Sequence, residues 1–347
     1  MTKRGIYIVM ETRIVTPDEK NIRAAGKLIR EGDLVAFPTE TVYGLGADAL
    51  NAGAVNQIFI AKGRPQDNPL IVHISDMQML RGLCEMNANA EKLAAAFWPG
   101  PLTMLLPKTC AVPDVTTAGL DTVGIRMPDH AAALALIAAA GTPIAAPSAN
   151  LSGRPSPTSA AHVFEDMNGR IPLIIDGGAC RVGVESTVLD VSGAEPVIFR
   201  PGAITQEMVA AVCGGCSVAD SVMRPLKEGE RAPSPGMKHR HYAPKGRMTV
   251  FIGEKENVCR AVLREYPLEA NTCVLCHEDH LSLYKGMNAK SIGKDARESA
   301  RLLFALLRDM DEEGYDRILC EGWAVKGEAL AVMNRMARAA AFDLREV

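Results

Sequence analysis

The segment KGRPQDNPL, residues 62–70, combines two cations and an amide with two prolines, directly before an apolar run. Each proline fixes its own φ and disfavours helical backbone at the residue before it, so the segment is expected to be stiff and extended. Lys62 supplies a compact ammonium charge and Arg64 a planar guanidinium that can donate two parallel hydrogen bonds. Together they suit a polyphosphate. The alternative is a solvated basic helix end, because cations gather at helix C-termini.

Two further polar clusters follow apolar strands, FPTETVYGLGAD at 37–48 and APSANLSGRPSPT at 146–158. Ligands of open α/β sheets bind outside the carboxyl ends of strands, so the two clusters are expected to converge there. Taken singly, each cluster could be ordinary turn chemistry, since Ser, Asn, Gly and Pro are common in loops. Their recurrence favours a shared site. The hydroxyl, amide and carboxylate groups that they offer belong to Thr39, Glu40, Thr41, Tyr43, Ser148, Asn150, Ser152, Ser156 and Thr158.

Arginines accompany these clusters. Arg126 lies within the apolar strand VGIRM, where an unpaired cation would be costly, so it needs a carboxylate or an anionic ligand. Ser186 begins a later strand and Arg200 ends another. The sequence contains no Walker lysine loop, no G-x-S-x-G elbow, no H-E-x-x-H and no G-x-G-x-x-G after a strand. These groups therefore indicate positioning and charge stabilisation, which is the mode of phosphoryl and nucleotidyl transfer.

The segment CVLCHEDH, residues 273–280, suggests a metal or haem instead. It matches C-x-x-C-H haem attachment and loosely matches a zinc site. Haem attachment requires export, for which there is no signal. Cys273 and Cys276 fall in an apolar strand and would point to opposite faces, so a zinc site is not favoured. A metal or redox site at the pair Cys213 and Cys216 in CGGC is likewise not favoured.

Hydrophobic periodicity predicts two α/β domains separated by a linker. A capping box at 16–19 and Gly32 predict a helix over 17–31, and further helices near 52–61, 88–97, 130–140 and 158–167 alternate with short apolar strands. Two late strands at 186–200 predict an antiparallel hairpin within a mixed sheet. The first domain is placed at 1–215.

Residues 216–246 are rich in Pro, Gly and basic residues, so they are expected to form a linker. The strands MTVFIG, TCVLC and RILCEG then alternate with helices predicted over 254–265, 295–310 and 326–341. Residues 247–347 are therefore expected to form a smaller three-layer, Rossmann-like α/β domain.

Composition excludes several classes of protein. The 347 residues are 48% hydrophobic and 23% charged, typical of folded globular chains, and no apolar run reaches the roughly 20 residues of a membrane span. Nine cysteines in apolar contexts indicate a reducing compartment, so a cytoplasmic location is expected. A formal net charge of −3 gives the whole chain no electrostatic reason to seek nucleic acid.

Five blocks resemble the Sua5/YrdC/YwlC family of L-threonylcarbamoyladenylate synthases in order and approximate spacing: PTETVYGLG, KGRPQDNPL, PSANLSGRPSPT, STVLD and RPG. A sixth block, SPGMKHRHYAP at 234–244, resembles the long form of the family, which carries a second domain. The resemblance implies a YrdC-like open twisted mixed sheet followed by a Sua5 C-terminal domain.

The resemblance also implies a reaction. L-threonine, bicarbonate or CO₂, and ATP with Mg²⁺ would give threonylcarbamoyl-AMP, pyrophosphate and water, for N6-threonylcarbamoyladenosine (t6A) modification of tRNA by a transiently bound downstream transferase complex. The catalytic cations would be Lys62 and Arg64. The implied ATP site is Arg64, Asn68, Thr122, Ser148, Asn150, Thr158, Arg200 and Tyr242, with Tyr242 on a closing linker. The implied threonine site is Thr41, His73, Arg126, Ser148 and Ser186.

Two other functions remain as alternatives. One is a non-catalytic protein that binds double-stranded RNA or tRNA, which the net charge and the 5% aromatic content disfavour. The other is the carbamoyl-transfer module of hydrogenase maturation, whose accompanying acylphosphatase and zinc-finger segments are absent here. A weak tRNA contact stays open, and no membrane contact is expected.

Overall fold

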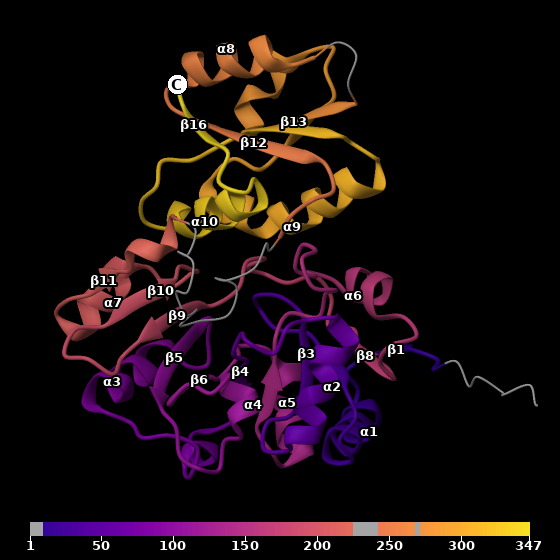
Figure 1. The fold of residues 1–347 in the computed structure, drawn as a ribbon, viewed down its shortest axis with the longest axis vertical. Coiled ribbons are helices and arrows are strands. Elements are labelled where there is room, and N and C mark those ends of the chain that lie inside the picture. The colour runs from indigo at the N-terminus through magenta and orange to yellow at the C-terminus, as the bar shows by residue number, and fades with distance from the viewer. Residues whose placement is uncertain (1–9, 225–241, 268–270) are drawn as a thin grey trace, which may run out of the picture.

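The computed structural model describes residues 10–224, 242–267 and 271–347, which form two α/β bodies, one above the other in Figure 1. The first body is built on an eleven-stranded sheet. From edge to edge its strands are β1 (Arg13–Val15), β8 (Leu173–Ile175), β2 (Val35–Phe37), β3 (Gly44–Asp48), β7 (Ile144–Ala146), β4 (Ile71–His73), β6 (Thr122–Arg126), β5 (Leu102–Pro107), β9 (Thr187–Asp190), β10 (Val197–Arg200) and β11 (Ser217–Val218).

The sheet is mixed, as predicted. β9 and β10 form the expected antiparallel hairpin, whereas β5 and β9 pair in parallel. The predicted α/β class and its open mixed sheet are therefore confirmed.

Helices cover both faces of this sheet. On one face lie α1 (Glu19–Arg30) and α5 (Ala131–Ala140), which pack against β2, β7 and β8. A Cβ at Gly26 would lie 2.7 Å from the backbone carbonyl carbon of Ala139, so the absence of a side chain lets the two helices approach closely. On the other face lie α2 (Ala52–Lys62), α3 (Ala88–Phe97), α6 (Ala160–Met167) and α7 (Gln206–Cys213). Short turns of helix complete the body at α4 (Asp114–Thr117), η1 (Met77–Leu80) and η2 (Asp220–Val222).

Two details of the sequence prediction were wrong. Helix α1 begins at Glu19 with Asp18 as its N-cap, whose carboxylate accepts the backbone N–H of Asn21, so the cap lies two residues after Thr16. No strand was predicted over β3, because its glycines are typical of turns. In the sheet those glycines are required: a Cβ at Gly46 would lie 2.7 Å from Ile144 Cγ2.

The second body is a five-stranded sheet whose strand pairs are all parallel. Its order is β14 (Ala289–Ser291), β13 (Thr272–Cys276), β15 (Arg317–Glu321), β12 (Arg247–Ile252) and β16 (Leu344–Glu346). Helix α8 (Lys255–Glu265) covers one face, and α9 (Ala296–Glu312) and α10 (Ala329–Ala339) cover the other. The short helix η3 (Glu278–Tyr284) follows β13. The predicted three-layer α/β domain and its three helices are confirmed.

The segment between the bodies is described in part. β11 pairs with β10 and extends the first sheet beyond residue 215, and η2 follows it, so the start of the expected linker belongs to the first body. Residues 225–241, which carry most of the predicted lid, lie outside the described residues.

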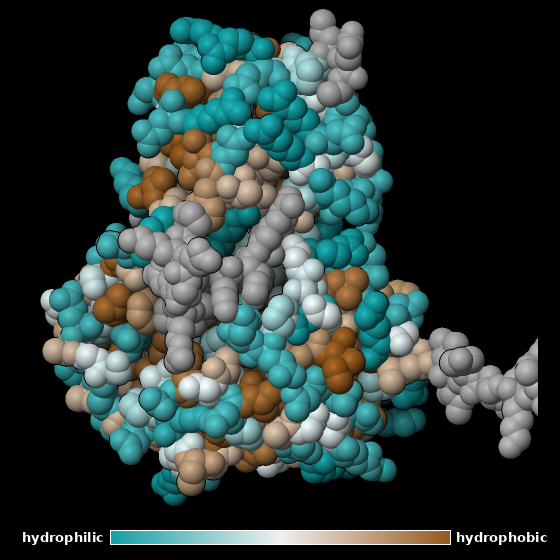
Figure 2. Space-filling model, viewed as in Figure 1, coloured by the Kyte–Doolittle hydropathy of each residue, from teal (hydrophilic) through white to brown (hydrophobic). Residues whose placement is uncertain are grey.

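Helices α9 and α10 form the layer that faces the first body (Figure 1). Val42, Val184 and Tyr242 belong to the same buried apolar cluster as these helices, so the two bodies share a core. In Figure 2 the visible surface is mainly hydrophilic, with apolar residues in small scattered groups. None of the helices in the described part of the chain has the length and apolar character of a membrane span. All nine cysteines are free thiols.

Candidate active site

One pocket of the first body gathers the polar groups that the sequence placed at strand ends. It lies where β2, β4, β6 and β7 end and where β9 begins. Its polar lining residues are Thr39, Thr41, Tyr43, Arg64, His73, Arg126, Ser148, Asn150, Ser156, Glu185, Ser186, Arg200 and Tyr242. The expected convergence of the two polar clusters is therefore observed.

The turn after β2 is held by its own hydroxyls. Thr39 Oγ1 donates to the Val42 carbonyl at 2.6 Å and accepts the backbone N–H of Thr41 at 3.1 Å. This closure reverses the chain into β3 and presents the Thr41 hydroxyl to the pocket. Tyr43 OH donates to the Gly178 carbonyl at 2.7 Å, which ties Tyr43 to the segment after β8.

Arg64 reaches the pocket because the chain leaves α2 sharply. Gly63 caps the helix with φ 60°, and Arg64 Nη2 then donates to the carbonyls of Asn68 and Pro69 at 3.0 and 3.1 Å. Its Nε is buried and has no hydrogen-bond partner among the described residues. Burial, with a smaller contribution from the Arg200 charge, lowers the pKa of Arg64 to about 10. The guanidinium stays charged at neutral pH and is supplied mainly with neutral carbonyl partners.

Lys62 lies behind the pocket and is not part of its lining. Its Nζ donates to the carbonyls of Ser148 and Asn150 at 2.6 and 2.5 Å. Burial, followed by repulsion from Arg64, lowers its pKa well below the ordinary value. Lys62 therefore holds the Ser148–Asn150 loop in place, which differs from the direct phosphate contact expected from the sequence.

Arg126 and Glu40 form a buried ion pair at the carboxyl end of β6. Arg126 Nη2 lies 2.7 Å from Glu40 Oε2, and both side chains are under 5% exposed. Arg126 faces the pocket, while Glu40 lies outside its lining. The sequence required a partner for Arg126, and Glu40 supplies it.

His73 lies beside Arg126 as a neutral ring. Burial and the Arg126 charge lower the pKa of His73 to about 3. Its Nδ1 is buried without a hydrogen-bond partner among the described residues. The ring therefore offers the pocket an uncharged hydrogen-bonding group.

Arg200 and Ser186 line the wall formed by β9 and β10. Arg200 Nε donates to the Ser186 carbonyl and Nη2 to Ser186 Oγ, both at 3.0 Å. Ser186 Oγ also lies 2.8 Å from Thr103 Oγ1. Burial lowers the pKa of Arg200 to about 10.

Glu185 was not singled out in the sequence, although it lies in the pocket wall. Its Oε1 accepts the Ser156 hydroxyl at 2.5 Å, and its Oε2 accepts Arg335 Nε at 2.8 Å. Burial alone would raise the pKa of Glu185, but Arg335 and Arg200 outweigh it and the pKa lies below the ordinary value. The only sequence signal was an acid directly before Ser186, whose partner in α10 lies 150 residues away.

Tyr242 closes the pocket on the side of the second body. It is 5% exposed, adopts φ 63°, and stacks on Phe304 of α9 with ring centroids 5.0 Å apart. The Arg335 guanidinium lies over the same ring at 5.8 Å from its centroid. The second body therefore supports the pocket wall through Phe304, which packs on Tyr242, and Arg335, which donates to Glu185.

Three other expected site residues lie outside the lining. Asn68 is fully buried beside Arg64, and its side-chain oxygen and nitrogen have no hydrogen-bond partner among the described residues. Thr122 begins β6 and lines a separate small pocket. Thr158 contacts His162 Nδ1 through both its backbone N–H and its hydroxyl.

The charge balance of the pocket favours an anion. Three arginines line it with one carboxylate, Glu185, which is shared with Arg335. A Mg²⁺ ion usually needs one or two free carboxylates besides substrate phosphates. Here Glu40 and Glu185 are both engaged by arginines, so the described residues of this pocket do not fit a resident metal.

Comparison with known proteins finds two family models, whose boundary near residue 203 lies before α7, β11 and η2 of the first body. Residues 27–202 match the Sua5, YciO and YrdC family model, described as telomere recombination. Residues 204–341 match a model described as the C-terminal domain of threonylcarbamoyl-AMP synthase.

Full-length relatives carry the same name. A threonylcarbamoyl-AMP synthase of Pyrococcus abyssi is 48% identical over 334 residues, covering 95% of this chain and 97% of that protein. One of Bacillus subtilis is 46% identical over 344 residues, covering 98% of each. The crystal structure of P. abyssi Sua5 complexed with L-threonine superposes with a TM-score of 0.88 at 47% identity, covering 97% of this chain and 99% of that one.

Proposed function

The chain belongs to the Sua5 family of threonylcarbamoyl-AMP synthases, and from this premise we propose that its pocket joins ATP to L-threonine and bicarbonate or CO₂. The protein is an enzyme of the nucleotidyltransferase kind. Its product is threonylcarbamoyl-AMP, formed together with pyrophosphate. The observation that carries the proposal is a pocket with three arginines, surrounded by hydroxyl and amide groups, in which one carboxylate is present.

The proposed reaction has two steps, and neither needs a nucleophile from the enzyme. The neutral amine of threonine adds to CO₂, which forms an N–C bond and releases a proton to give a carbamate. An oxygen of that carbamate then attacks the α-phosphorus of ATP, and the bond from the α-phosphorus to the bridging oxygen breaks as pyrophosphate leaves. Starting from bicarbonate, the first step releases water.

In our proposal the phosphates bind at the Arg64 and Arg200 side of the pocket. Arg64 donates to carbonyl oxygens and Arg200 to the carbonyl and hydroxyl of Ser186, and both guanidiniums would compensate phosphate charge during transfer. The Ser148 and Asn150 groups, supported by Lys62, line the same region. Mg²⁺ arrives with ATP as part of the substrate.

The threonine end is proposed to lie near Arg126, Thr41 and Ser186. Arg126 would hold the amino-acid carboxylate while Glu40 fixes the orientation of the guanidinium from behind. His73, neutral and partly unsatisfied, would accept or donate a hydrogen bond without adding charge. Tyr242, packed against Phe304, would exclude water from the labile carbamate.

From the same premise we propose that the protein acts in the cytoplasm and supplies its short-lived product to a downstream transferase that modifies tRNA. The nine free thiols support a reducing compartment.

The test is pyrophosphate release from ATP, measured with threonine and bicarbonate added separately and together. The proposal requires release that depends on both. ATP hydrolysis indifferent to threonine would contradict it, and double-stranded RNA binding without any turnover would favour the non-catalytic alternative.

A further inference from the structure

A second cluster of chemistry-bearing residues lies in the second body, away from the pocket. His277 directly follows β13, and Glu321 is the last residue of β15. These two strands are parallel neighbours, so their carboxyl ends adjoin. His280, on η3, completes the cluster. The three side chains offer ligand atoms that all lie within 4.8 Å of one another.

The topology makes this point of the sheet a natural binding position. The chain leaves β13 toward β14, the neighbour on one side, whereas it leaves β15 through α10 toward β16 at the opposite edge. Outgoing connections therefore diverge between β13 and β15. In open parallel sheets, ligands bind in the crevice outside the carboxyl ends of strands at such a switch point.

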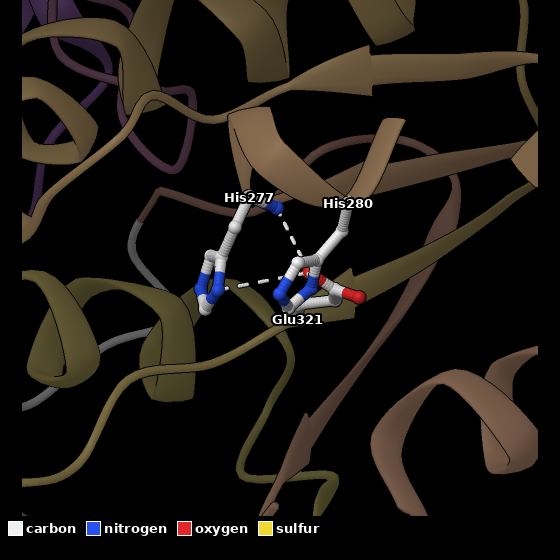
Figure 3. A group of neighbouring side chains, drawn as sticks. All are labelled: His277, His280 and Glu321. Atoms are coloured by element: carbon white, nitrogen blue, oxygen red, sulfur yellow. Dashed lines mark hydrogen bonds and ion pairs between the residues drawn. The ribbon is translucent and has the colours of Figure 1, made fainter. Parts of the chain in front are cut away.

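The geometry suits a small tetrahedral cation. His280 Nδ1 lies 2.8 Å and His277 Nδ1 3.7 Å from the same carboxylate oxygen, Oε2 of Glu321. Figure 3 shows the three side chains gathered around this oxygen. Ligand bonds of about 2.0 Å imply tetrahedral edges of about 3.3 Å, and the two distances bracket that value. Small side-chain shifts would bring all three groups onto one ion.

The surroundings orient these groups as they do in metal sites. Glu321 is 1% exposed, and its carboxylate accepts the Tyr284 hydroxyl at 2.6 Å and the backbone N–H of His277 at 2.8 Å. Asp279 Oδ2 lies 3.5 Å from Nε2 of His280. A carboxylate on the far nitrogen of a histidine is the usual device for aiming the near nitrogen at a metal. Between His280 Nδ1 and Oε2 of Glu321, which lie 2.8 Å apart, there is either a proton or a cation.

We propose that His277, His280 and Glu321 bind one divalent cation of the Zn²⁺ class, leaving a fourth coordination position for solvent or an incoming ligand. The C-x-x-C-H pattern contributes only its histidine. Cys273 and Cys276 are buried in apolar clusters on opposite faces of the sheet, as their spacing predicted. The site belongs to the second body, so its test does not depend on the proposed synthase reaction.

The experiment titrates the metal-free full-length protein with Zn²⁺ alone, without nucleotide, and compares two ligand variants with a matched control. We expect one equivalent to bind the wild type and to bind His277→Gln and His280→Gln about 100-fold more weakly. Asp279→Asn, which removes the carboxylate beside His280 together with its surface ion pair to Lys255, should weaken binding about tenfold. His130→Asn removes an imidazole outside the cluster and keeps an N-capping side chain on α5, so its affinity should be unchanged.

Two further readouts separate the alternatives. Co²⁺ should give the ligand-field bands of a tetrahedral nitrogen and oxygen site without a thiolate charge-transfer band. The melting temperature should rise with Zn²⁺ in the wild type but not in folded His280→Gln. A wild type that binds no Zn²⁺, or binds it no more tightly than the ligand variants, would show that a proton occupies the position and would overturn the proposal.

Discussion

The pocket and the contact between the two bodies both bury arginines, but they supply them with different partners. At the contact, Arg308 of α9 donates to Asp166 at 2.7 Å and to Glu165 at 3.0 Å, and Arg335 of α10 donates to Glu185. In the pocket, Arg64 Nη2 donates to the carbonyl oxygens of Asn68 and Pro69 instead. Both arginines of the contact are under 2% exposed.

The difference separates structural cations from binding cations. A buried arginine that faces a carboxylate has its charge compensated within the protein, and removing either partner leaves an unpaired buried charge. A guanidinium held by neutral oxygens keeps its charge available to an anion. Arg126 lies between the two cases, since it faces the pocket yet is paired with Glu40.

The largest expected effect is on catalysis, at Arg64. Arg64→Ala should lower threonine-dependent pyrophosphate release by about 10³-fold or more, because phosphate charge would lose its compensation. The free energy of unfolding should change by less than about 1 kcal/mol, since no carboxylate is left unpaired. Arg23→Ala on α1, whose side chain is 75% exposed, is the matched control and should behave as wild type. An unfolded Arg64→Ala would assign Arg64 to the structural group.

The next effect is on stability, at Asp166. This carboxylate is fully buried between Arg308 and Arg154, so Asp166→Ala should cost about 3–5 kcal/mol of unfolding free energy. Chemical denaturation followed by the fluorescence of Trp98 and Trp323, one in each body, measures it. The double variant Asp166→Leu with Arg308→Met should recover part of the loss. A cost below about 1 kcal/mol would mean that the contact pair is not structural.

Arg335 tests whether the contact also supports the pocket. Without Arg335, the Glu185 carboxylate would lose its partner in α10 and compete for Arg200, and we expect turnover to fall by about 10²-fold in Arg335→Met. Arg308→Met weakens the same contact without touching a lining residue, so it should alter stability far more than KM or kcat. Equal kinetic losses in both variants would instead assign the effect to docking alone.

The last effect, small within any one pH unit, is the pH dependence of stability that comes from His73. Its pKa lies at about 3 in the folded protein, below the ordinary 6.5, so the unfolded chain binds more protons between these values. Its contribution is present above pH 6.5 and is lost as the pH falls, by up to about 1.4 kcal/mol per unit. His73→Phe should therefore flatten the decline of unfolding free energy between pH 6.5 and pH 4. An identical slope in both proteins would mean that the ring is protonated when folded.

Local sequence patterns were sufficient to predict most of the helices and strands and many of the residues that line the pocket. Thr41, Arg64, Ser148 and Asn150 were found because short polar motifs at strand ends are readable along the chain, whereas His73 was expected only from the family resemblance. β3 was missed because a glycine-rich strand is indistinguishable from a turn until its tight packing against β2 and β7 is known. Lys62 looked like a phosphate ligand because its charge is visible in sequence, while the carbonyls that hold it are not.

The sequence alone determined the α/β class, the two bodies, the mixed first sheet and the family, because periodicity, capping residues and ordered motifs are properties of neighbouring residues. The tertiary structure alone decided which charges are compensated. Glu40 meets Arg126, Glu185 meets Arg335, and Glu321 meets two histidines across separations that no local pattern records. The function of a buried charge depends on its partner, and folding brings that partner from a distant part of the chain.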